Sequence, residues 1–413
     1  MRVCTAFNRI LSLPGAGVAS VEFSDEGLVI GLRRSRRRKL LCPCGAKTWA
    51  RYDGSRRRWR HLDFGACRVF VVADVFRINC RGCGRVRTEQ VPWARPNARH
   101  TRDFDDVVGW LAQRADKTTV ATLLRCSWEA VDNITKRLVD EQLDDSRLDD
   151  LYHIGVDEIS YKRGHRYLTI VADHDSGKVV WTATDRKKES FGSFFDALGD
   201  ERVKQIQAIT LDASSIYQPI ARAHAPQATL CVDPFHVIKW CNEALDSFYR
   251  AQPAPLPVFD KSYSNYTNPA WKRMRFALRT GAENLDKDRR AMLNELRRHN
   301  YRLYRAWELK EGLRALYRDV NPEDAAAYLR RWCASAIRSK ITPFHNLVRR
   351  IHKHFNAIIA AIRLGLSNSR LEGINAKIRV IQRRGYGHPT AESLMAMIHL
   401  CLGGINLTLP TQR

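Results

Sequence analysis

The sequence predicts a multi-domain α/β protein, and three observations lead to this prediction. A strongly basic N-terminal segment contains two close pairs of cysteines. A stretch with helical periodicity follows and ends in an acidic run over residues 140–150. Beyond that run, apolar β-rich segments alternate with helical ones, which is typical of a domain with a mixed sheet. With 413 residues, of which 44% are hydrophobic, the chain is long enough for about two to four such domains.

The balance of charge indicates the kind of partner. The chain has 69 Lys and Arg against 44 Asp and Glu, a formal net charge of +25. Such an excess repels itself, which favours a polyanionic partner such as nucleic acid. No apolar run approaches the ~18 residues that cross a membrane, and the 11 cysteines are spread unevenly, as in a reducing compartment. We therefore expect a DNA-binding protein of the cytoplasm with no membrane partner.

Residues 1–98 form the predicted basic module. Between Gly31 and Arg60 the sequence has twelve Lys and Arg and a single acid. Tryptophan and tyrosine are interleaved with these arginines, a combination that suits backbone contacts and base stacking on DNA. A solvated basic surface is the alternative interpretation. The candidate DNA-binding residues of this module are Arg56, Arg57, Arg58 and Trp59.

The two cysteine pairs predict a zinc site within this module. They are Cys42 with Cys44 and Cys80 with Cys83, and a glycine follows each pair. The pairs resemble zinc knuckles, in which four thiolates fill a tetrahedral shell around a structural Zn²⁺ ion. The gap within the first pair is one residue shorter than usual. Four buried thiols without a metal are the alternative, and Cys67 is a candidate substitute ligand.

Residues 99–150 predict a helix-turn-helix followed by an acidic linker. Apolar residues recur at helical spacing on both sides of a short break at residues 125–127. Ser127 is placed to cap the second helix. A helical hairpin that never contacts DNA gives the same pattern, so this prediction depends on the basic module before it. The change in charge places a domain boundary near Leu151.

Residues 151–240 predict the α/β domain, in the order three strands, helix, strand, helix, strand. The first strand is expected to end at Asp157 and the fourth at Asp212, and the last is stopped by the segment from Asp233 to His236. If the first and fourth strands are neighbours, their two terminal carboxylates meet at one edge of the sheet. That edge is where α/β folds place their sites.

The remaining residues are predicted to be mostly helical. Residues 241–366 form a helical insertion, and residues 367–413 contain a final amphipathic helix that starts near Ser367. The buried stripe of this helix consists of Leu371, Ile374, Ile378 and Ile381. An adjoining face carries Glu372, Asn375, Arg379 and Arg383.

Three acids, Asp157, Asp212 and Glu372, are the candidate catalytic residues. Hard divalent cations such as Mg²⁺ or Mn²⁺ bind carboxylate oxygens, and two such ions can activate a water and stabilise the leaving oxygen of a phosphodiester. Each acid also has a structural alternative. Asp157 could pair with Lys162, Asp212 could cap the next helix, and Glu372 fits a capping box with Ser369.

Three blocks of the sequence together resemble the ISL-three family of insertion-sequence transposases. They are GVDEISYKRGHRYLTIVADHDSGKVV (155–180), ITLDASSIYQPIARAHAPQATLCVDPFHVIKW (209–240) and SNSRLEGINAKIRVIQRRGYGH (367–388). The resemblance implies a zinc-binding module, a helix-turn-helix, and a DDE catalytic domain of ribonuclease-H-like fold with a large helical insertion. By position, the catalytic acids of the family fall on Asp157, Asp212 and Glu372.

The resemblance also implies DNA transposition, in which element ends are cut and their 3′ hydroxyls joined to target DNA with two Mg²⁺ or Mn²⁺ ions. The expected partners are double-stranded DNA, as terminal inverted repeats and as target, and a second copy of the chain, in a prokaryotic nucleoid. Expected phosphate contacts are Lys377, Arg379, Arg383 and Arg384, and expected supporting residues are Asp233, His236 and Asn375. The alternatives are a non-catalytic zinc and helix-turn-helix DNA-binding regulator and a nuclease of similar fold without strand transfer.

Overall fold

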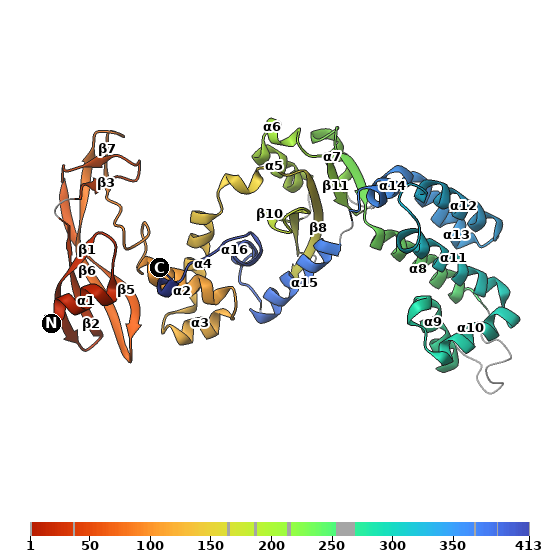
Figure 1. The fold of residues 1–413 in the computed structure, drawn as a ribbon, viewed down its shortest axis with the longest axis horizontal. Coiled ribbons are helices and arrows are strands. Elements are labelled where there is room, and N and C mark those ends of the chain that lie inside the picture. Colours follow the sequence, from red (N-terminus) through yellow and green to blue (C-terminus); the bar gives the residue numbers. More distant parts are fainter. Residues whose placement is uncertain are drawn as a thin grey trace. The chain divides into compact units, whose positions relative to one another are not determined.

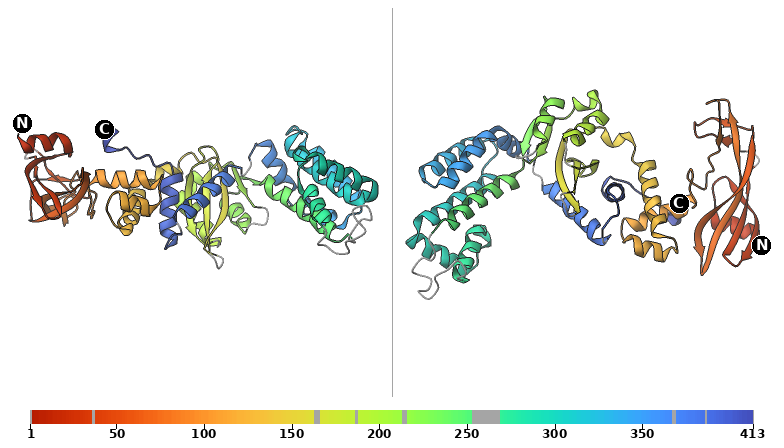
Figure 2. Two further views of the ribbon diagram at one scale, coloured as in Figure 1. Left: turned by 90° about the horizontal axis from the view of Figure 1, so that it is seen from below. Right: turned by 180° about the vertical axis from the view of Figure 1, so that it is seen from behind.

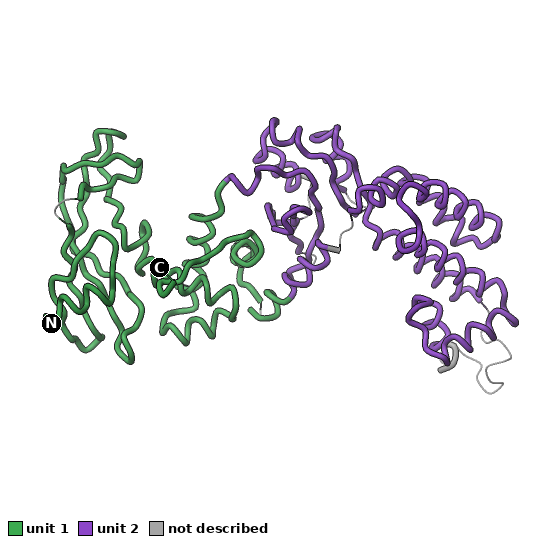
Figure 3. Tube along the Cα trace, viewed as in Figure 1, with its two compact units in different colours: residues 1–144, 380–413 green, residues 145–379 purple. Residues whose placement is uncertain are grey.

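The computed structural model describes residues 2–35, 38–162, 166–185, 188–212, 216–252, 269–366, 369–385 and 387–412 (Figure 1, Figure 2). These residues form two compact units (Figure 3). Unit 1 comprises residues 1–144 and 380–413, and unit 2 comprises residues 145–379. Both units contain helices, and both contain a mixed sheet, so the predicted multi-domain α/β class is confirmed. Within the described ranges, no helix is both long and apolar enough to span a membrane.

The N-terminal half of unit 1 is a five-stranded sheet, which is not among the predicted elements. Its order is β1-β2-β6-β5, with β7 paired to β6. Strands β2 and β6 run parallel, and the other pairs are antiparallel. Two short strands, β3 and β4, form a separate hairpin. The bounds are α1 Val3–Leu11, β1 Ala16–Ser24, β2 Gly27–Arg34, β3 Leu40–Leu41, β4 Lys47–Thr48, β5 Asp53–Phe64, β6 Cys67–Cys80 and β7 Arg85–Thr88.

Three helices of unit 1 form the helix-turn-helix region. They are α2 Arg102–Ala112, α3 Lys117–Leu123 and α4 Trp128–Gln142, followed by the short 3₁₀ helix η1 Asp145–Leu148 at the start of unit 2. The Ser127 hydroxyl accepts the backbone N–H of Ala130, so the predicted cap is confirmed. Arg125, with φ of 50°, makes the break between α3 and α4.

Residues from far along the chain complete this helical region. Helix α16 (Ala391–Leu402) packs against α4, and Leu407 joins the apolar cluster of α2, α3 and α4. The side-chain amide of Gln113 donates to the backbone carbonyls of Leu400 (2.8 Å) and Ile405 (3.0 Å). The helix-turn-helix region therefore folds from two chain segments that are more than 240 residues apart (391 − 142 = 249).

Unit 2 contains the mixed sheet that the sequence predicts. Its order is β10-β9-β8-β11-β12, with β9 antiparallel to both β8 and β10 and β11 parallel to both β8 and β12. The apolar face packs against a cluster of phenylalanines from α5. The bounds are β8 His153–Lys162, β9 Arg166–Asp173, β10 Val179–Thr184, α5 Lys188–Leu198, α6 Asp200–Val203, β11 Ala208–Leu211, α7 Gln218–His224 and β12 Thr229–Val232.

The remainder of unit 2 is helical, as predicted. One apolar cluster runs through the helices from Val237 to Ile359, and α14 packs on β12. The helix predicted to start near Ser367 is described from Ser369 onward, and its predicted first residue lies outside the described residues. It is not the final helix that the sequence predicts, because α16 (Ala391–Leu402) follows it. The bounds are α8 Pro234–Arg250, α9 Pro269–Arg279, η2 Ala282–Asn284, α10 Lys287–His299, α11 Tyr301–Arg318, α12 Ala325–Arg338, α13 Thr342–Lys353, α14 Phe355–Arg363 and α15 Ser369–Arg384. The last residues of α15, from Val380, and η3 Pro410–Gln412 belong to unit 1.

Candidate active site and DNA-binding elements

Asp157 lies on β8, and Asp212 directly follows β11, the neighbouring parallel strand of the unit 2 sheet. The register pairs Thr210 of β11 with Gly155 of β8, and each aspartate is two residues further along its own chain segment. The two carboxylates are near enough to interact, since the charge of Asp212 acts on Asp157. Asp157 is not at the end of β8, as the sequence analysis expects, because the strand continues in pairing with β9 to Lys162. Asp212 directly follows the last residue of β11, as predicted.

Asp157 is held by hydrogen bonds on both of its oxygens. Oδ2 accepts from Nδ2 of Asn375 at 2.6 Å, and Oδ1 accepts from the backbone N–H of Glu158 at 2.7 Å. Burial raises the pKa of Asp157, and the negative charge of Asp212 raises it further, while these hydrogen bonds and His236 act in the opposite direction. Two mutually repelling carboxylates of this kind form a site that a divalent cation would stabilise.

His236 connects Asp212 to the first turn of α8. Its Nδ1 lies 3.3 Å from Oδ1 of Asp212, and its Nε2 lies 3.9 Å from Oδ2 of Asp233. Asp233 is buried and caps α8 by accepting the backbone N–H of Phe235 at 3.2 Å. The Asp233 to His236 segment therefore places an imidazole against the second aspartate through a helix cap.

Glu372 lies in the first turn of α15 and is exposed. It precedes Asn375 by three residues, and side chains at this spacing are neighbours on a helix surface. Asn375 bonds to Asp157, so α15 lies beside the first aspartate. Within the described residues, the three acids do not form a group whose oxygens all lie within ligating reach of one metal ion. The buried stripe of Leu371, Ile374, Ile378 and Ile381 is confirmed, since each is at most 6% exposed. The Ser369 side chain of the alternative capping box lies outside the described residues.

Two residues that the sequence analysis does not single out, Gly155 and Arg370, hold the start of α15 on the sheet. A side chain at Gly155 would overlap Leu371, so only glycine lets the helix approach β8 closely. Arg370 donates to the backbone carbonyls of His174 and Asp175, the latter at 2.9 Å. In the sequence, the glycine at position 155, two residues before Asp157, is the local sign of this close contact.

The predicted phosphate contacts on α15 have different environments. Lys377, Arg379 and Arg383 are exposed. The guanidinium group of Arg384 instead donates to the backbone carbonyls of Ala112 (2.8 Å) and Gln113 (3.2 Å), at the end of α2. Arg384 thus caps the C-terminus of α2, and in this structure its guanidinium group makes a structural contact.

The arginine run of the N-terminal module lies along β5. Arg56, Arg57 and Arg58 are exposed, but Trp59 is only 4% exposed and packs edge-on against Trp93 at 5.8 Å between ring centroids. Because side chains alternate on a strand, Trp59 faces the apolar core of the sheet. Its ring is therefore not available for base stacking in this structure, contrary to the expectation from the interleaved pattern.

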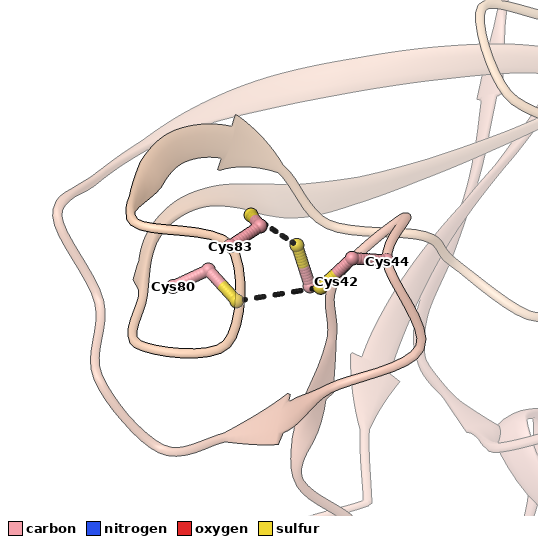
Figure 4. A group of neighbouring side chains, drawn as sticks. All are labelled: Cys42, Cys44, Cys80 and Cys83. Carbon is pink, nitrogen blue, oxygen red and sulfur yellow. Dashed lines mark hydrogen bonds between the residues drawn. The ribbon is translucent and has the colours of Figure 1, made fainter.

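The four cysteines of the two pairs converge at one end of the module (Figure 4). Their sulfur atoms all lie within 4.8 Å of one another, with 3.9 Å from Cys42 to Cys83 and 3.6 Å from Cys44 to Cys80. A tetrahedron with Zn–S bonds of 2.3 Å has edges of about 3.8 Å. Burial raises the pKa of Cys42 to about 12, whereas backbone hydrogen bonds from Cys83 are the main cause that lowers the pKa of Cys80 to about 7. The donor set and its geometry fit a zinc ion, and Cys67 is outside the cluster.

Comparisons with known proteins agree with this architecture. Residues 154–398 match a transposase family, the DDE domain of ISL3 elements, and residues 89–139 match the helix-turn-helix domain of transposase family ISL3. The chain is 38% identical to the transposase for insertion sequence element IS1557 of Mycobacterium tuberculosis, over 95% of this chain and 94% of that protein. It is 28% identical to the transposase for insertion sequence element IS1001 of Bordetella parapertussis, over 94% of this chain and 96% of that protein.

These matches cover both the helical region of unit 1 and the sheet with the two aspartates. The presence of the DDE domain implies an enzyme that uses divalent metal, and the helix-turn-helix domain implies DNA binding. A non-catalytic regulator is not favoured, because such a protein has no need of the DDE domain. The chain belongs to transposase family ISL3 and is a DNA transposase.

Proposed function

We propose that Asp157, Asp212 and Glu372 form the catalytic centre of DNA cleavage and strand transfer in this transposase. The observation that carries the proposal is the hydrogen bond from Asn375 to Asp157, because it holds α15, the helix whose first turn carries Glu372, beside the first aspartate. The strand order and directions of this sheet support a ribonuclease-H-like fold, with residues 151–240 as its core and 241–366 as a helical insertion. Of the expected C-terminal part, 367–413, only the start of α15 belongs to this unit, because residues 380–413 pack in unit 1.

The three carboxylates would hold two Mg²⁺ or Mn²⁺ ions, for which their oxygens are suitable ligands. When bound, such ions lower the pKa of the attacking hydroxyl or water and neutralise charge on the leaving oxygen. The remaining steps belong to the protein. Asn375 orients Asp157 and favours its ionised form, and His236 orients Asp212. In this proposal the exposed Lys377 and Arg379 of α15 bind phosphates of the DNA substrate.

The other modules supply recognition in this proposal. Residues 1–98, stabilised by one structural zinc ion on Cys42, Cys44, Cys80 and Cys83, bind the phosphate backbone, and residues 99–150 read base edges through α4. Their DNA substrates are the terminal inverted repeats of the element in the nucleoid. Since two element ends react together, the active complex contains at least two copies of the chain.

An assay with the DNA that flanks this reading frame tests the catalytic assignment. Full-length protein, a labelled duplex of that DNA and a circular plasmid are incubated with Mg²⁺, and cleaved and plasmid-joined products are separated. We expect both products from wild type and a loss of roughly a hundredfold or more for Asp157→Asn, Asp212→Asn and Glu372→Gln, because each removes a charge and keeps the side-chain shape.

The matched control is Asp196→Asn, which neutralises an exposed acid on α5 in the same unit and should leave both products unchanged. Full activity of any of the three test variants would remove that residue from the site. Cleavage by wild type without joined product would instead support the nuclease alternative.

A further inference from the structure

Unit 1 contains a groove between its sheet and the start of the helix that would read DNA. The groove has a volume of about 1210 Å³. One wall is the β5–β6 hairpin with the β1–β2 turn beside it, and the other wall includes Ser127 and Ala130 in the first turn of α4. In a helix-turn-helix, the N-terminal residues of the second helix contact base edges. The groove therefore opens where a duplex would meet the protein.

Hydrogen bonds join the two walls of the groove to each other. Nε of Arg125, in the break between α3 and α4, donates to Asp63 of β5 at 2.7 Å, and its Nη1 donates to the backbone carbonyl of Ala66 at 2.9 Å. Nearby, Nδ1 of His61 lies 2.8 Å from the hydroxyl of Thr101, the residue that caps α2. These bonds join sheet and helices on either side of the groove, so its shape exists before DNA binds and need not be ordered by it.

The groove is lined with arginines from three different segments. Arg58 of β5, Arg68 of β6 and Arg99 before α2 are all exposed. Arg58 is already positioned, because its guanidinium lies 3.6 Å from the ring centroid of Phe70 on the same face of the sheet. A stacked guanidinium loses less side-chain entropy when it binds a phosphate than a free one does.

Two acids border the groove, at the turn between β1 and β2. Asp25 and Glu26 both line it, and Glu26 forms an ion pair with Arg58 in which the carboxylate side chain is 65% exposed. An incoming phosphate competes with this carboxylate for the arginine. The pair therefore weakens DNA binding at this point, and removing the acid should strengthen it.

We infer that this groove binds the sugar–phosphate backbone of duplex DNA directly beside the base pairs that α4 reads. Arg58, Arg68 and Arg99 contact phosphates, and the exposed Glu129 and Asn133 of α4 face the base edges. The N-terminal sheet and the helix-turn-helix thus form one continuous reading surface, in which the sheet sets the register of the helix on the duplex. This inference rests on the proposed binding of DNA by unit 1 and specifies where the backbone lies.

The salt dependence of DNA binding tests the inference. Full-length wild type, Arg68→Ala and Arg99→Ala are titrated with a fluorescent 30-base-pair duplex of random sequence at several salt concentrations. Each phosphate contact adds about 0.9 to the slope of log K against log salt, so each variant should lose about one unit of slope and bind about eightfold more weakly at 0.1 M salt. Glu26→Gln should bind more tightly than wild type, an effect that a folding defect does not produce.

The matched control is Arg9→Ala, which removes an exposed arginine from α1 in the same module but outside the groove, and it should keep the wild-type slope. If wild type binds no duplex, the proposed function itself fails. If wild type binds but Arg68→Ala and Arg99→Ala keep its slope and affinity, the groove is wrong and the proposed function stands.

Cysteine alkylation gives a second measurement that needs no substitution. Cys67 lines the groove and is half-buried, and Cys4 is half-buried outside it. We expect the same random-sequence duplex to slow the reaction of Cys67 with N-ethylmaleimide, measured by mass spectrometry, and to leave the rate at Cys4 unchanged. Equal rates at Cys67 with and without bound duplex would overturn the inference.

Discussion

Asp157 depends on its neighbours for the negative charge that a divalent cation requires. Burial and Asp212 both raise its pKa, and the amide of Asn375 is one of the groups that lower it. A hydrogen bond to a charged group contributes about 1.5–3 kcal/mol. Asn375 is therefore a positioning residue whose effect should be visible in metal and pH dependence as well as in rate.

Replacement of Asn375 by Ala should make cleavage depend on higher metal concentration and higher pH. Loss of the amide raises the pKa of Asp157 further, so the acid limb of the pH–rate profile moves up, and half-maximal activity should need roughly tenfold more Mg²⁺. Both are measured with the labelled-duplex assay. Ala376→Ser, at an exposed neighbour on α15, is the control. Unchanged metal and pH profiles in Asn375→Ala would exclude the positioning role.

The candidate acids could be found from the sequence, but their surroundings could not. Asp212 follows an apolar strand and is visible as a strand-end acid, whereas Asp157 is followed by further strand residues that alternate polar and apolar. The burial of Trp59 could not be predicted from the run of arginines around it, because Arg57 on the same face of β5 is exposed while Arg60 on the other face is buried.

At the scale of elements, the β3–β4 hairpin and the β6–β7 turn each contribute two cysteines to one cluster. We expect the purified full-length protein to contain one zinc ion per chain, and Cys80→Ser to lose it, because three thiolates leave the tetrahedral shell incomplete. Elemental analysis by mass spectrometry measures this. Cys67→Ser should retain the metal, since its sulfur is outside the cluster. Zinc retained in Cys80→Ser would contradict the assignment.

Helices α3, α4 and α16 share a buried ion pair. Lys117 (3% exposed) bonds to Asp132, and both bond to the hydroxyl of Ser393 on α16, at 2.9 Å from the lysine and 2.5 Å from the aspartate. Burial opposes the ionisation of Asp132, but hydrogen bonds from Lys117, Lys136 and Ser393 lower its pKa to about 2. The pair is therefore charged and satisfied only when all three helices are in place.

Replacement of Lys117 by Ala should destabilise the helix-turn-helix region by about 3–5 kcal/mol, because it leaves a buried carboxylate without its main partner. Hydrogen exchange of backbone amides in α3, α4 and α16 measures this locally. Lys136→Ala removes the more exposed partner of the same aspartate and should cost only about 0–1 kcal/mol. Equal exchange in the two variants would refute the role of Lys117.

At the scale of the whole molecule, buried neutral histidines make stability depend on pH. Burial is the main cause that lowers the pKa of His61, His100, His174 and His388 to about 4. The unfolded chain titrates near 6.5, so between about pH 6.5 and 4 it binds more protons than the folded chain. The contribution of these neutral histidines to the free energy of unfolding is therefore fully present above about pH 6.5, and it is lost as the pH falls towards 4.

Thermal unfolding at pH 7.5 and pH 5 checks this expectation. Each such histidine should cost about 2 kcal/mol at pH 5, and the melting temperature of the full chain should fall accordingly. In His388→Leu, which replaces a histidine that is 8% exposed, the drop between the two pH values should be smaller than in wild type. An identical drop would exclude His388 as a contributor.

The order of elements in unit 2 could be predicted from local patterns, because each strand and helix has its own periodicity. The composition of the helix-turn-helix region could not, since Gln113, Lys117 and Asp132 look like surface polar residues until α16 covers them. Contacts between segments that are distant along the chain leave no local signal. The groove could not be predicted for the same reason, because the residues that line it come from four separate stretches of sequence.

Because α16 completes the helix-turn-helix region, that region can fold fully only after α16 has been synthesised. A ribosome that has translated the whole of unit 2 has still not released residues 391–407, and α4 then lacks the surface that covers Asp132. A nascent or prematurely terminated chain would consequently contain Asp157, Asp212 and Glu372 but not a complete helix-turn-helix region. The helix-turn-helix region can therefore complete its fold only after residues 391–407 have been synthesised.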